Sequence, residues 1–313
     1  MPSMAEQIEL GVEIARGLRL RSPLMVASGT FGYGFDAPQA DRSALGAIVT
    51  KGTTLRSRSG NSPTRIAETP SGMLNAIGLQ NPGVDQVVRE YAPRWATWDV
   101  PVIVNIAGES VDEYAAIATR LDGVPGVAAI ELNISCPNVA NGLLFGTDPG
   151  LASQLTAAVR RATSLPLIVK LTPNVTDIVA MGRAVASAGA DAVSAINTYV
   201  GMAIDVRRRK PVLARKSGGL SGPAIKPLAL HAVWSLAAEL EIPVIAMGGI
   251  MSGTDALEFL LAGAVAVQLG TVNYVRPNAA GEIKEAIVAY MWREGFSVLA
   301  ELPLRPPRVM AGV

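Results

Sequence analysis

The stretch PVIVNIAGESVDEYAAIATRLDGVPGVAAIELN, residues 101–133, contains the unit that decides the fold. It begins with an apolar run, continues with a segment at 111–121 whose apolar residues recur every three or four positions, and ends in a second apolar run. Continuous apolar runs of four to six residues are typical of strands buried on both faces, as in parallel sheets. The stretch therefore predicts a strand, a helix and a second, parallel strand.

The same unit recurs along the whole chain. Eight apolar runs end in polar or glycine residues, at 23–29, 47–52, 101–108, 128–138, 166–174, 192–198, 243–250 and 264–272. Helical patterns lie at 111–121, 149–163, 176–189, 224–240 and 253–263, with Thr176 and Thr254 as expected N-caps and Gly189 and Gly263 as expected ends. Eight strands that alternate with helices predict an α/β fold, the (β/α)8 TIM barrel, over a single domain of residues 1–313. A doubly wound sheet is the competing fold, but no GxGxxG follows the first strand.

Three segments depart from the repeat. Residues 8–20, IELGVEIARGLRL, alternate with period two and turn at Arg16-Gly17, so we expect a β-hairpin that closes the base of the barrel. The long segments 53–91 and 200–222 follow the second and sixth strands. Loops after barrel strands lie on the catalytic face, and loops of this length are usually lids or binding loops.

Composition excludes several classes of protein. The 313 residues are half apolar, and 27 basic residues against 26 acidic ones give a net charge of +1, which argues against a nucleic-acid binder. A single cysteine rules out an intrachain disulfide and favours the reducing cytoplasm. The acidic start does not suit a signal peptide, and the longest uncharged run, 259–275, is short for a membrane span. The one histidine, His231, lies mid-helix and is expected to be packed or half-exposed.

Catalytic groups of a barrel come from the carboxyl ends of several strands. Here those ends carry Ser28, Lys51, Asn105, Asn133 with Cys136, Lys170, Asn197 with Thr198, Gly248-Gly249 and Gly270-Thr271. No carboxylate pair is among them, which argues against a glycosidase or a magnesium enolase. Two glycine turns after the last two strands favour a phosphorylated ligand, although each alone could be a plain tight turn.

Cys136 and the two lysines suggest the chemistry. A lone cysteine is commonly a small buried hydrophobe, but Cys136 follows a strand into the polar sequence NISCPN. Lys51 and Lys170 lie among asparagine and threonine rather than carboxylates, which suits a flat polar ligand such as a flavin better than a Schiff-base aldolase. The cluster Arg207–Lys210 is expected to be a solvated loop, or else a surface that docks an acidic partner or anionic substrate.

Nine motifs in order resemble those of the dihydroorotate dehydrogenase family. They are SGTFGYG (28–34), KGTT (51–54), NAIGLQNPG (75–83), ELNISCPN (131–138), VKLTPN (169–174), INT (196–198), GGLSGPAIKP (218–227), MGGI (247–250) and LGTV (269–272). The sequence is most similar to the catalytic subunits of class 1B, which pass electrons to NAD through a second subunit. It departs from the family at Arg215-Lys216-Ser217, where a less charged stretch is expected.

The resemblance implies specific site residues. It implies FMN contacts at Ser28, Lys51, Gly52, Asn105, Asn133, Lys170, Ile196, Gly222, Gly248, Gly249, Gly270 and Thr271. It implies substrate contacts at Lys51, Asn75, Ala76, Ile77, Gly78, Leu79, Asn133, Asn197 and Thr198, and a catalytic base at Cys136. Membrane-linked class 2 members carry serine at that position and an extra N-terminal helix.

The resemblance also implies a reaction and an assembly. Dihydroorotate would be oxidised to orotate in de novo pyrimidine biosynthesis, with a proton passing to Cys136 and a hydride to FMN. The resemblance implies a partner subunit that carries FAD and a 2Fe-2S cluster. The single cysteine of this chain agrees with that, because an all-cysteine iron–sulfur cluster needs about four ligands. The expected assembly is a homodimer core within a heterotetramer, with no metal site on this chain and no nucleic-acid or membrane partner.

Three alternatives stay open. Another FMN barrel acting on dihydropyrimidines is the nearest, including a tRNA dihydrouridine enzyme, which the net charge of +1 disfavours. A Schiff-base aldolase would be recognised by the lack of a flavin spectrum. A barrel that only binds a metabolite would leave the polar surroundings of Cys136 without explanation.

Overall fold

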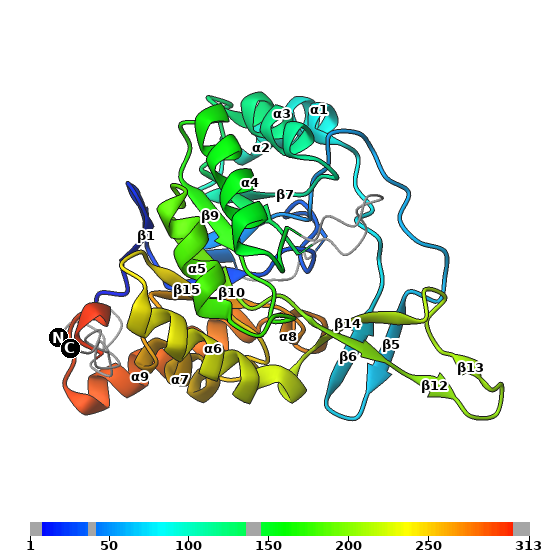
Figure 1. Ribbon diagram of the computed structural model, residues 1–313. Helices are drawn as coiled ribbons and strands as arrows, with labels where there is room; N and C mark the ends of the chain where they lie inside the picture. Colours follow the sequence, from blue (N-terminus) through cyan, green and yellow to red (C-terminus); the bar gives the residue numbers. More distant parts are fainter. Residues whose placement is uncertain (1–7, 37–41, 136–144, 303–313) are drawn as a thin grey trace, which may run out of the picture.

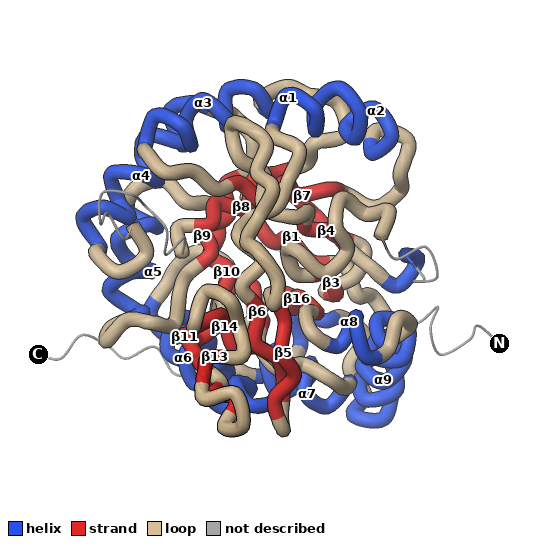
Figure 2. Tube along the Cα trace, turned by 90° about the vertical axis from the view of Figure 1, so that its right-hand side faces the viewer, coloured by secondary structure: helices blue, strands red, loops and turns tan. Residues whose placement is uncertain are grey.

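A closed ring of parallel strands forms the centre of the molecule. The computed structural model describes residues 8–36, 42–135 and 145–302. The ring consists of β3 (Leu24–Val26), β4 (Ala47–Val49), β7 (Val102–Ile106), β8 (Ala129–Asn133), β9 (Leu167–Lys170), β10 (Ala192–Ala195), β15 (Val244–Met247) and β16 (Ala266–Leu269). Figure 2 shows these strands as an inner ring within a ring of helices. The predicted TIM barrel is confirmed.

Helices cover the outside of the barrel. The longer ones are α3 (Val111–Leu121), α4 (Pro149–Ala162), α5 (Ile178–Ser187), α6 (Lys226–Glu239), α7 (Gly253–Leu261) and α9 (Ala279–Glu294). Shorter turns of helix are α1 (Val84–Gln86), α2 (Ala92–Trp95) and α8 (Val272–Val275). The five helices predicted from apolar periodicity are present, while α9 was not predicted. Among the described residues, no helix has both the length and the apolarity needed to cross a membrane.

The N-caps of two helices differ from those expected. Asp177, not Thr176, caps α5, because its carboxylate accepts the Ala180 N–H at 2.9 Å. Ser252, not Thr254, caps α7 through a reciprocal capping box with Asp255. A cap must place its oxygen over the free N–H groups of the first turn, and both threonines lie one or two residues off that position. Helix ends were predicted correctly: Gly189 and Gly263 follow α5 and α7 with φ of 100° and 103°.

The N-terminal hairpin closes one end of the barrel, as predicted. Strands β1 (Val12–Ala15) and β2 (Leu18–Leu20) pair antiparallel. Ile14 and Leu20 are fully buried against apolar side chains from every strand of the barrel: Met25, Ala47, Val49, Ile103, Ala129, Ile168, Ala192, Ile245 and Ala266. This end of the barrel is therefore a packed apolar core, and polar chemistry is confined to the other end.

The two long segments leave the carboxyl ends of β4 and β10 and pair with each other. Strands β5 (Ile66–Thr69), β6 (Gly72–Asn75), β11 (Tyr199–Met202) and β14 (Ser217–Ser221) form an antiparallel sheet in the order β11-β14-β6-β5, called the projecting sheet below. The short strands β12 (Ile204–Asp205) and β13 (Lys210–Pro211) extend beyond it (Figure 1). These segments were predicted only as long loops, because their pairing joins residues more than 140 positions apart.

Candidate active site

A layer of polar side chains crosses the inside of the barrel directly above the apolar end. Side chains alternate along a strand, so the residue two positions after an inward apolar residue also points inward. These second inward residues are Asn105, Glu131, Lys170, Ser194 and Gln268, called the polar layer below. All five are buried, with at most 5% of the residue exposed.

Glu131 connects the polar layer. Its Oε1 accepts a hydrogen bond from Asn105 Nδ2 at 2.7 Å and lies 3.6 Å from Lys170 Nζ. Its Oε2 accepts from Ser194 Oγ at 3.0 Å and from Gln268 Nε2 at 2.8 Å. A fully buried carboxylate is tolerated because every oxygen has donors around it and a cation lies beside it.

Sequence reasoning missed Glu131, Ser194 and Gln268, and the expectation that neither lysine lies near a carboxylate is wrong for Lys170. These residues lie within apolar runs, whereas functional groups of a barrel are expected at the ends of the runs. One signal was available. A glutamate in the middle of a strand that is buried on both faces needs hydrogen-bond donors around its carboxylate. The alternation of inward and outward side chains in the neighbouring strands indicates which polar residues point inward to supply them.

Two amide oxygens of the polar layer lack hydrogen-bond partners in the described structure. They are Asn105 Oδ1 and Gln268 Oε1, both buried. A carboxylate only accepts, so each amide turns its NH₂ group toward Glu131 and its oxygen away. Leaving a buried acceptor unpaired costs about 1–3 kcal/mol. The layer can therefore accept a hydrogen bond from a ligand that brings an N–H donor, as the ring of an oxidised flavin does.

Glycine turns at the ends of strands β14 and β15 form a cradle. Gly222, Gly248 and Gly249 have φ of 96°, 126° and 76°, the left-handed region that favours glycine. A Cβ on Gly249 would lie 2.9 Å from the Gly222 carbonyl oxygen, so the loops after β14 and β15 touch. Backbone N–H groups in such turns can approach a phosphate closely.

The end of β16 joins this cradle. Thr271 Oγ1 lies 2.8 Å from Ser221 Oγ, which ties the β16 end to β14. A Cβ on Gly270 would meet no atom closer than Ala27 Cβ at 3.8 Å, so space is open beside it. Buried Ile196 directly follows β10, and its N–H donates to the carbonyl of Met247 at the end of β15 at 3.0 Å. Together, these residues and the polar layer fit a phosphate-bearing flavin.

Two asparagine side chains, those of Asn133 and Asn197, meet above the polar layer. Asn133 Oδ1 accepts from Asn197 Nδ2 at 3.5 Å and from the Ser135 N–H at 3.1 Å. Asn197 Oδ1 in turn accepts the Thr198 N–H at 2.8 Å. The Tyr114 hydroxyl donates to the Asn133 carbonyl at 2.7 Å and fixes that strand end. The ends of β8 and β10 thus present a set of amides suited to a pyrimidine edge.

The segment 75–79 closes over this set from the projecting sheet. Asn75 Nδ2 donates to the Gly219 carbonyl at 3.4 Å, and Gly219 packs directly against Thr198. At the other end of the segment, Leu79 Cδ2 would lie 3.2 Å from a Cβ on Gly52. The segment therefore runs from the Thr198 side of the barrel mouth to the Lys51-Gly52 side, as a lid over a substrate would.

Lys51 and Ser28 lie at the ends of β4 and β3. The Lys51 N–H donates to the Gly32 carbonyl at 2.7 Å, which fixes the backbone there. Burial lowers the pKa of the Lys51 ammonium below its usual value of 10.5, and the Asp36 carboxylate opposes that shift. A partly desolvated ammonium at the mouth favours an anionic ligand. Half-buried Ser28 precedes Gly29, whose carbonyl accepts the Tyr274 hydroxyl at 2.9 Å.

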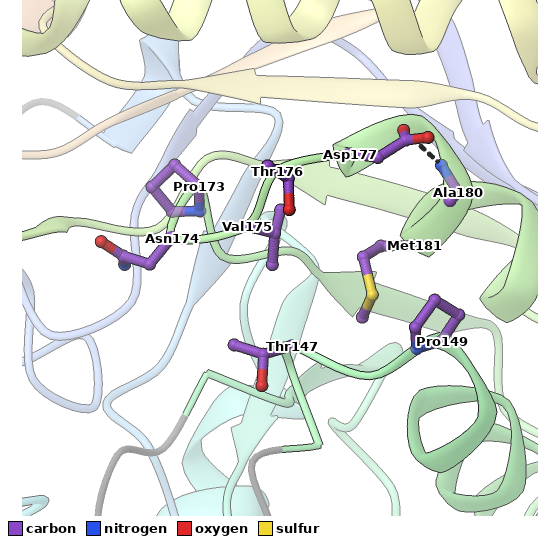
Figure 3. A pocket seen from close by; sticks show the side chains of 9 residues that line it. All are labelled: Thr147, Pro149, Pro173, Asn174, Val175, Thr176, Asp177, Ala180 and Met181. Atoms are coloured by element: carbon purple, nitrogen blue, oxygen red, sulfur yellow. Dashed lines mark hydrogen bonds between the residues drawn. The ribbon is translucent and has the colours of Figure 1, made fainter.

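An open hollow borders the site on the side of β9. Figure 3 shows its lining from the loops after β8 and β9 and the start of α5: Thr147, Pro149, Pro173, Asn174, Val175, Thr176, Asp177, Ala180 and Met181. It contains none of the predicted contact residues. Its link to them is Asn174, whose Nδ2 donates to the Thr198 carbonyl at 3.0 Å. The hollow thus borders the candidate site, and the Asn174 side chain in its lining helps to hold Thr198 in position.

Three further predictions concern Cys136, His231 and the basic cluster Arg207–Lys210. Cys136 lies outside the described residues, directly after Ser135. His231 is exposed on α6. The cluster Arg207–Lys210 spans the turn after β12 and the first residue of β13, and it is exposed, as predicted. Within the described ranges, no group of three or more His, Cys, Asp or Glu side chains could hold a metal ion.

Comparison with known proteins identifies the family. The sequence profile described as dihydroorotate dehydrogenase matches residues 10–291. The chain belongs to the dihydroorotate dehydrogenase family. The similarity expected from the nine motifs is confirmed.

Relatives named "Dihydroorotate dehydrogenase B (NAD(+)), catalytic subunit" match almost the whole chain. The protein from Geotalea daltonii is 54% identical over 94% of this chain and 97% of its own length. The protein from Desulforudis audaxviator is 54% identical over 95% and 97%, and that from Trichlorobacter lovleyi is 56% identical over 94% and 97%. The predicted likeness to the NAD-linked catalytic subunits is thereby confirmed.

Proposed function

We propose that this chain is the FMN-bearing catalytic subunit of an NAD-linked enzyme that oxidises dihydroorotate to orotate in pyrimidine biosynthesis. The observation that carries the proposal is the polar layer, whose buried Asn105 and Gln268 oxygens face no donor, together with the glycine cradle beside it. The names and extents of the relatives support the substrate and the acceptor.

The proposed FMN site uses both features. The glycine turns at Gly248-Gly249 and Gly270 would hold the phosphate through backbone N–H groups. Lys170 and Asn105 of the polar layer, together with Lys51-Gly52, would hold the ring. When bound, FMN supplies a two-electron acceptor for a hydride.

The protein's own residues would bind and orient the substrate. Lys51 offers a positive charge to the dihydroorotate carboxylate, since burial leaves its ammonium short of solvent. Asn75, Asn133 and Asn197 offer both N–H donors and carbonyl acceptors to the pyrimidine edge. The segment 75–79 would exclude water from above. Such positioning of two flat rings face to face accounts for much of the rate enhancement in reactions of this kind.

Cys136 is the proposed base. Its thiolate would take the proton from one ring carbon of dihydroorotate, while the hydride leaves the neighbouring carbon for FMN, so that a double bond forms between the two carbons. An unperturbed thiol ionises near pH 8.5, so flavin reduction by dihydroorotate should accelerate as the pH rises toward and through that range. Cys136→Ser should keep FMN and orotate binding and slow reduction by orders of magnitude at neutral pH.

The proposed electron path leaves this chain. Its single cysteine cannot supply the roughly four ligands of an iron–sulfur cluster. Electrons from reduced FMN would pass to a partner subunit that carries FAD and a 2Fe-2S cluster, and from there to NAD. The exposed basic turn Arg207–Lys210 would suit a partly acidic surface of that partner.

The exposed apolar face beside this turn supports an assembly. Val200, Met202, Ile204 and Val206 alternate from β11 to the residue after β12 and are 52–81% exposed. Monomers rarely expose apolar residues in such a continuous stripe. The expected homodimer core would cover this stripe, because a second copy brings the same apolar stripe to a two-fold contact, and the basic turn at its end would stay free for the electron-transfer partner.

The proposal is tested with the purified chain and the chain co-expressed with its partner. Acid release followed by mass measurement should give about one FMN per chain. Dihydroorotate should then reduce an artificial dye but not NAD until the partner is present. Folded protein that carries FAD or no flavin would contradict the cofactor, and rapid turnover of the isolated chain with NAD or fumarate would contradict the electron path.

A further inference from the structure

The buried carboxylate of Glu131 takes no part in the chemistry proposed above. We propose that Glu131 is a positioning residue that offsets the charge of Lys170 and fixes the direction of the Asn105 and Gln268 amides, and that it thereby sets the reduction potential of the bound flavin. This inference rests on the proposed function, because it concerns the FMN held above the polar layer.

The hydrogen bonds around Glu131 favour a carboxylate at this position. Three of its four neighbours, Asn105 Nδ2, Gln268 Nε2 and Lys170 Nζ, can only donate. Ser194 Oγ, the fourth neighbour, can donate as well, so a carboxylate satisfies all four contacts at once. Glu131 therefore places a negative charge inside the barrel, surrounded by hydrogen-bond donors.

The negative charge of Glu131 determines whether the Asn105 and Gln268 side chains turn an oxygen or an NH₂ group toward the proposed flavin. An amide can place either its oxygen or its NH₂ group toward a neighbour, and only the NH₂ group satisfies a carboxylate. Asn105 Oδ1 and Gln268 Oε1 are consequently turned away from Glu131, and they are the two amide oxygens left without partners. With a neutral glutamine at 131, both amides could turn over and present donors instead.

The same charge lies beside Lys170. The Lys170 side chain is only 7% exposed and that of Glu131 is fully buried, so solvent screens this pair little. Reduction adds negative charge to a flavin. A lone buried ammonium would stabilise the reduced form strongly, while a carboxylate 3.6 Å away cancels much of that effect. A nearly neutral pair leaves the reduced flavin a better electron donor, which suits a final acceptor as weak as NAD.

The direct test is the midpoint potential of bound FMN in the full chain. Glu131→Gln, which keeps size and removes charge, should shift the potential to more positive values. Lys170→Gln should shift it to more negative values. Glu131→Asp retains the charge and should lie closer to the wild-type potential than Glu131→Gln does. A role in folding alone would not move the potential in opposite directions.

A second comparison covers the case in which Glu131→Gln alone fails to fold. The double variant Glu131→Gln/Lys170→Gln replaces both charges by neutral side chains of similar size. Its FMN potential should be more positive than that of Lys170→Gln alone. Equal potentials in FMN-loaded variants would overturn the role of Glu131 and leave the proposed function standing. Folded wild-type protein without FMN would overturn the proposed function first.

Discussion

Thr198 Oγ1 occupies the place where Gly219 would carry a side chain: a Cβ on Gly219 would lie 2.1 Å from it. Gly219 belongs to β14 of the projecting sheet, and Thr198 follows the barrel strand β10. This contact packs the projecting sheet directly against Thr198, one of the proposed substrate-binding residues. The lid and the barrel mouth are therefore one packed unit at this point.

Gly219→Ala should impair substrate binding and spare FMN. The added methyl group must displace Thr198 or the sheet, since approaches below 3 Å are not tolerated. We expect the orotate dissociation constant to rise about tenfold or more, which corresponds to roughly 1.4 kcal/mol. A titration of the FMN-loaded protein with orotate, followed by the flavin spectrum, measures this.

Gly281→Ala is the matched control. Gly281 lies in α9 with no atom within 4 Å of a Cβ position, so alanine there should leave orotate affinity unchanged. It should also stabilise the helix by about 0.5–1 kcal/mol. An unchanged orotate affinity in Gly219→Ala would show that Thr198 does not contact the substrate.

Lys51→Gln should weaken orotate binding because it removes the cation proposed for the carboxylate. Hydrogen bonds to charged groups contribute about 1.5–3 kcal/mol, so a loss of roughly 10- to 150-fold in affinity is expected. Isothermal titration with orotate tests this, with FMN content measured in parallel. Affinity within twofold of wild type would exclude Lys51 from carboxylate binding.

The pH dependence of orotate binding should also report on Lys51. Burial lowers the pKa of its ammonium below 10.5, so the charge is lost at a lower pH than in a free lysine. Orotate affinity should therefore fall as the pH rises through that lowered pKa, and this alkaline step should be absent from Lys51→Gln. For folding, the sign is opposite: between the lowered pKa and 10.5 the unfolded chain binds more protons, so this group's contribution to stability rises with pH.

Ile14→Ala should destabilise the barrel without changing its chemistry. Ile14 is fully buried where the hairpin closes the apolar end, so its truncation leaves a cavity there. A loss of about 2–5 kcal/mol is expected, against about 0.5–1.5 kcal/mol for Ile14→Val. Urea unfolding measures both, and a change below 0.5 kcal/mol for alanine, well under the expected range, would mean that the hairpin does not seal the core.

Met202→Asp should dissociate the proposed homodimer. Met202 is 52% exposed within the apolar stripe, so a charge there would be buried without a partner in the contact. Light scattering should show a dimer for the wild type and a monomer for the variant, and Leu228→Asp on α6, with similar exposure, is the control. A dimer that persists in Met202→Asp would place the interface elsewhere.

Much of the fold was predictable because each barrel strand and its helix are local patterns. The eight apolar runs and the hairpin at 8–20 required no knowledge of distant residues. The projecting sheet was not predictable in this way. Its central pair joins Asn75 to Gly219, and β14 begins SGG, which has little tendency to form a strand alone.

The residues of the candidate site also fall into two groups: those predictable from a local pattern and those that depend on the arrangement of distant strands. Residues at strand ends, such as Lys51 and Asn133, were recognised because polar groups there interrupt an apolar run. Glu131 and Gln268 lie inside such runs, and their meaning depends on which strands face each other across the barrel. Strand order alone would have sufficed to place them in one layer, since inward positions follow from alternation.

The central claim is that dihydroorotate delivers its electrons to FMN held by this chain. The most direct measurement is the absorption spectrum of the purified chain without oxygen, before and after addition of dihydroorotate. We predict the spectrum of an oxidised flavin at first and its bleaching on addition, with one equivalent of orotate formed per flavin. A flavin spectrum that dihydroorotate leaves unchanged, in protein that still binds orotate, would contradict the account.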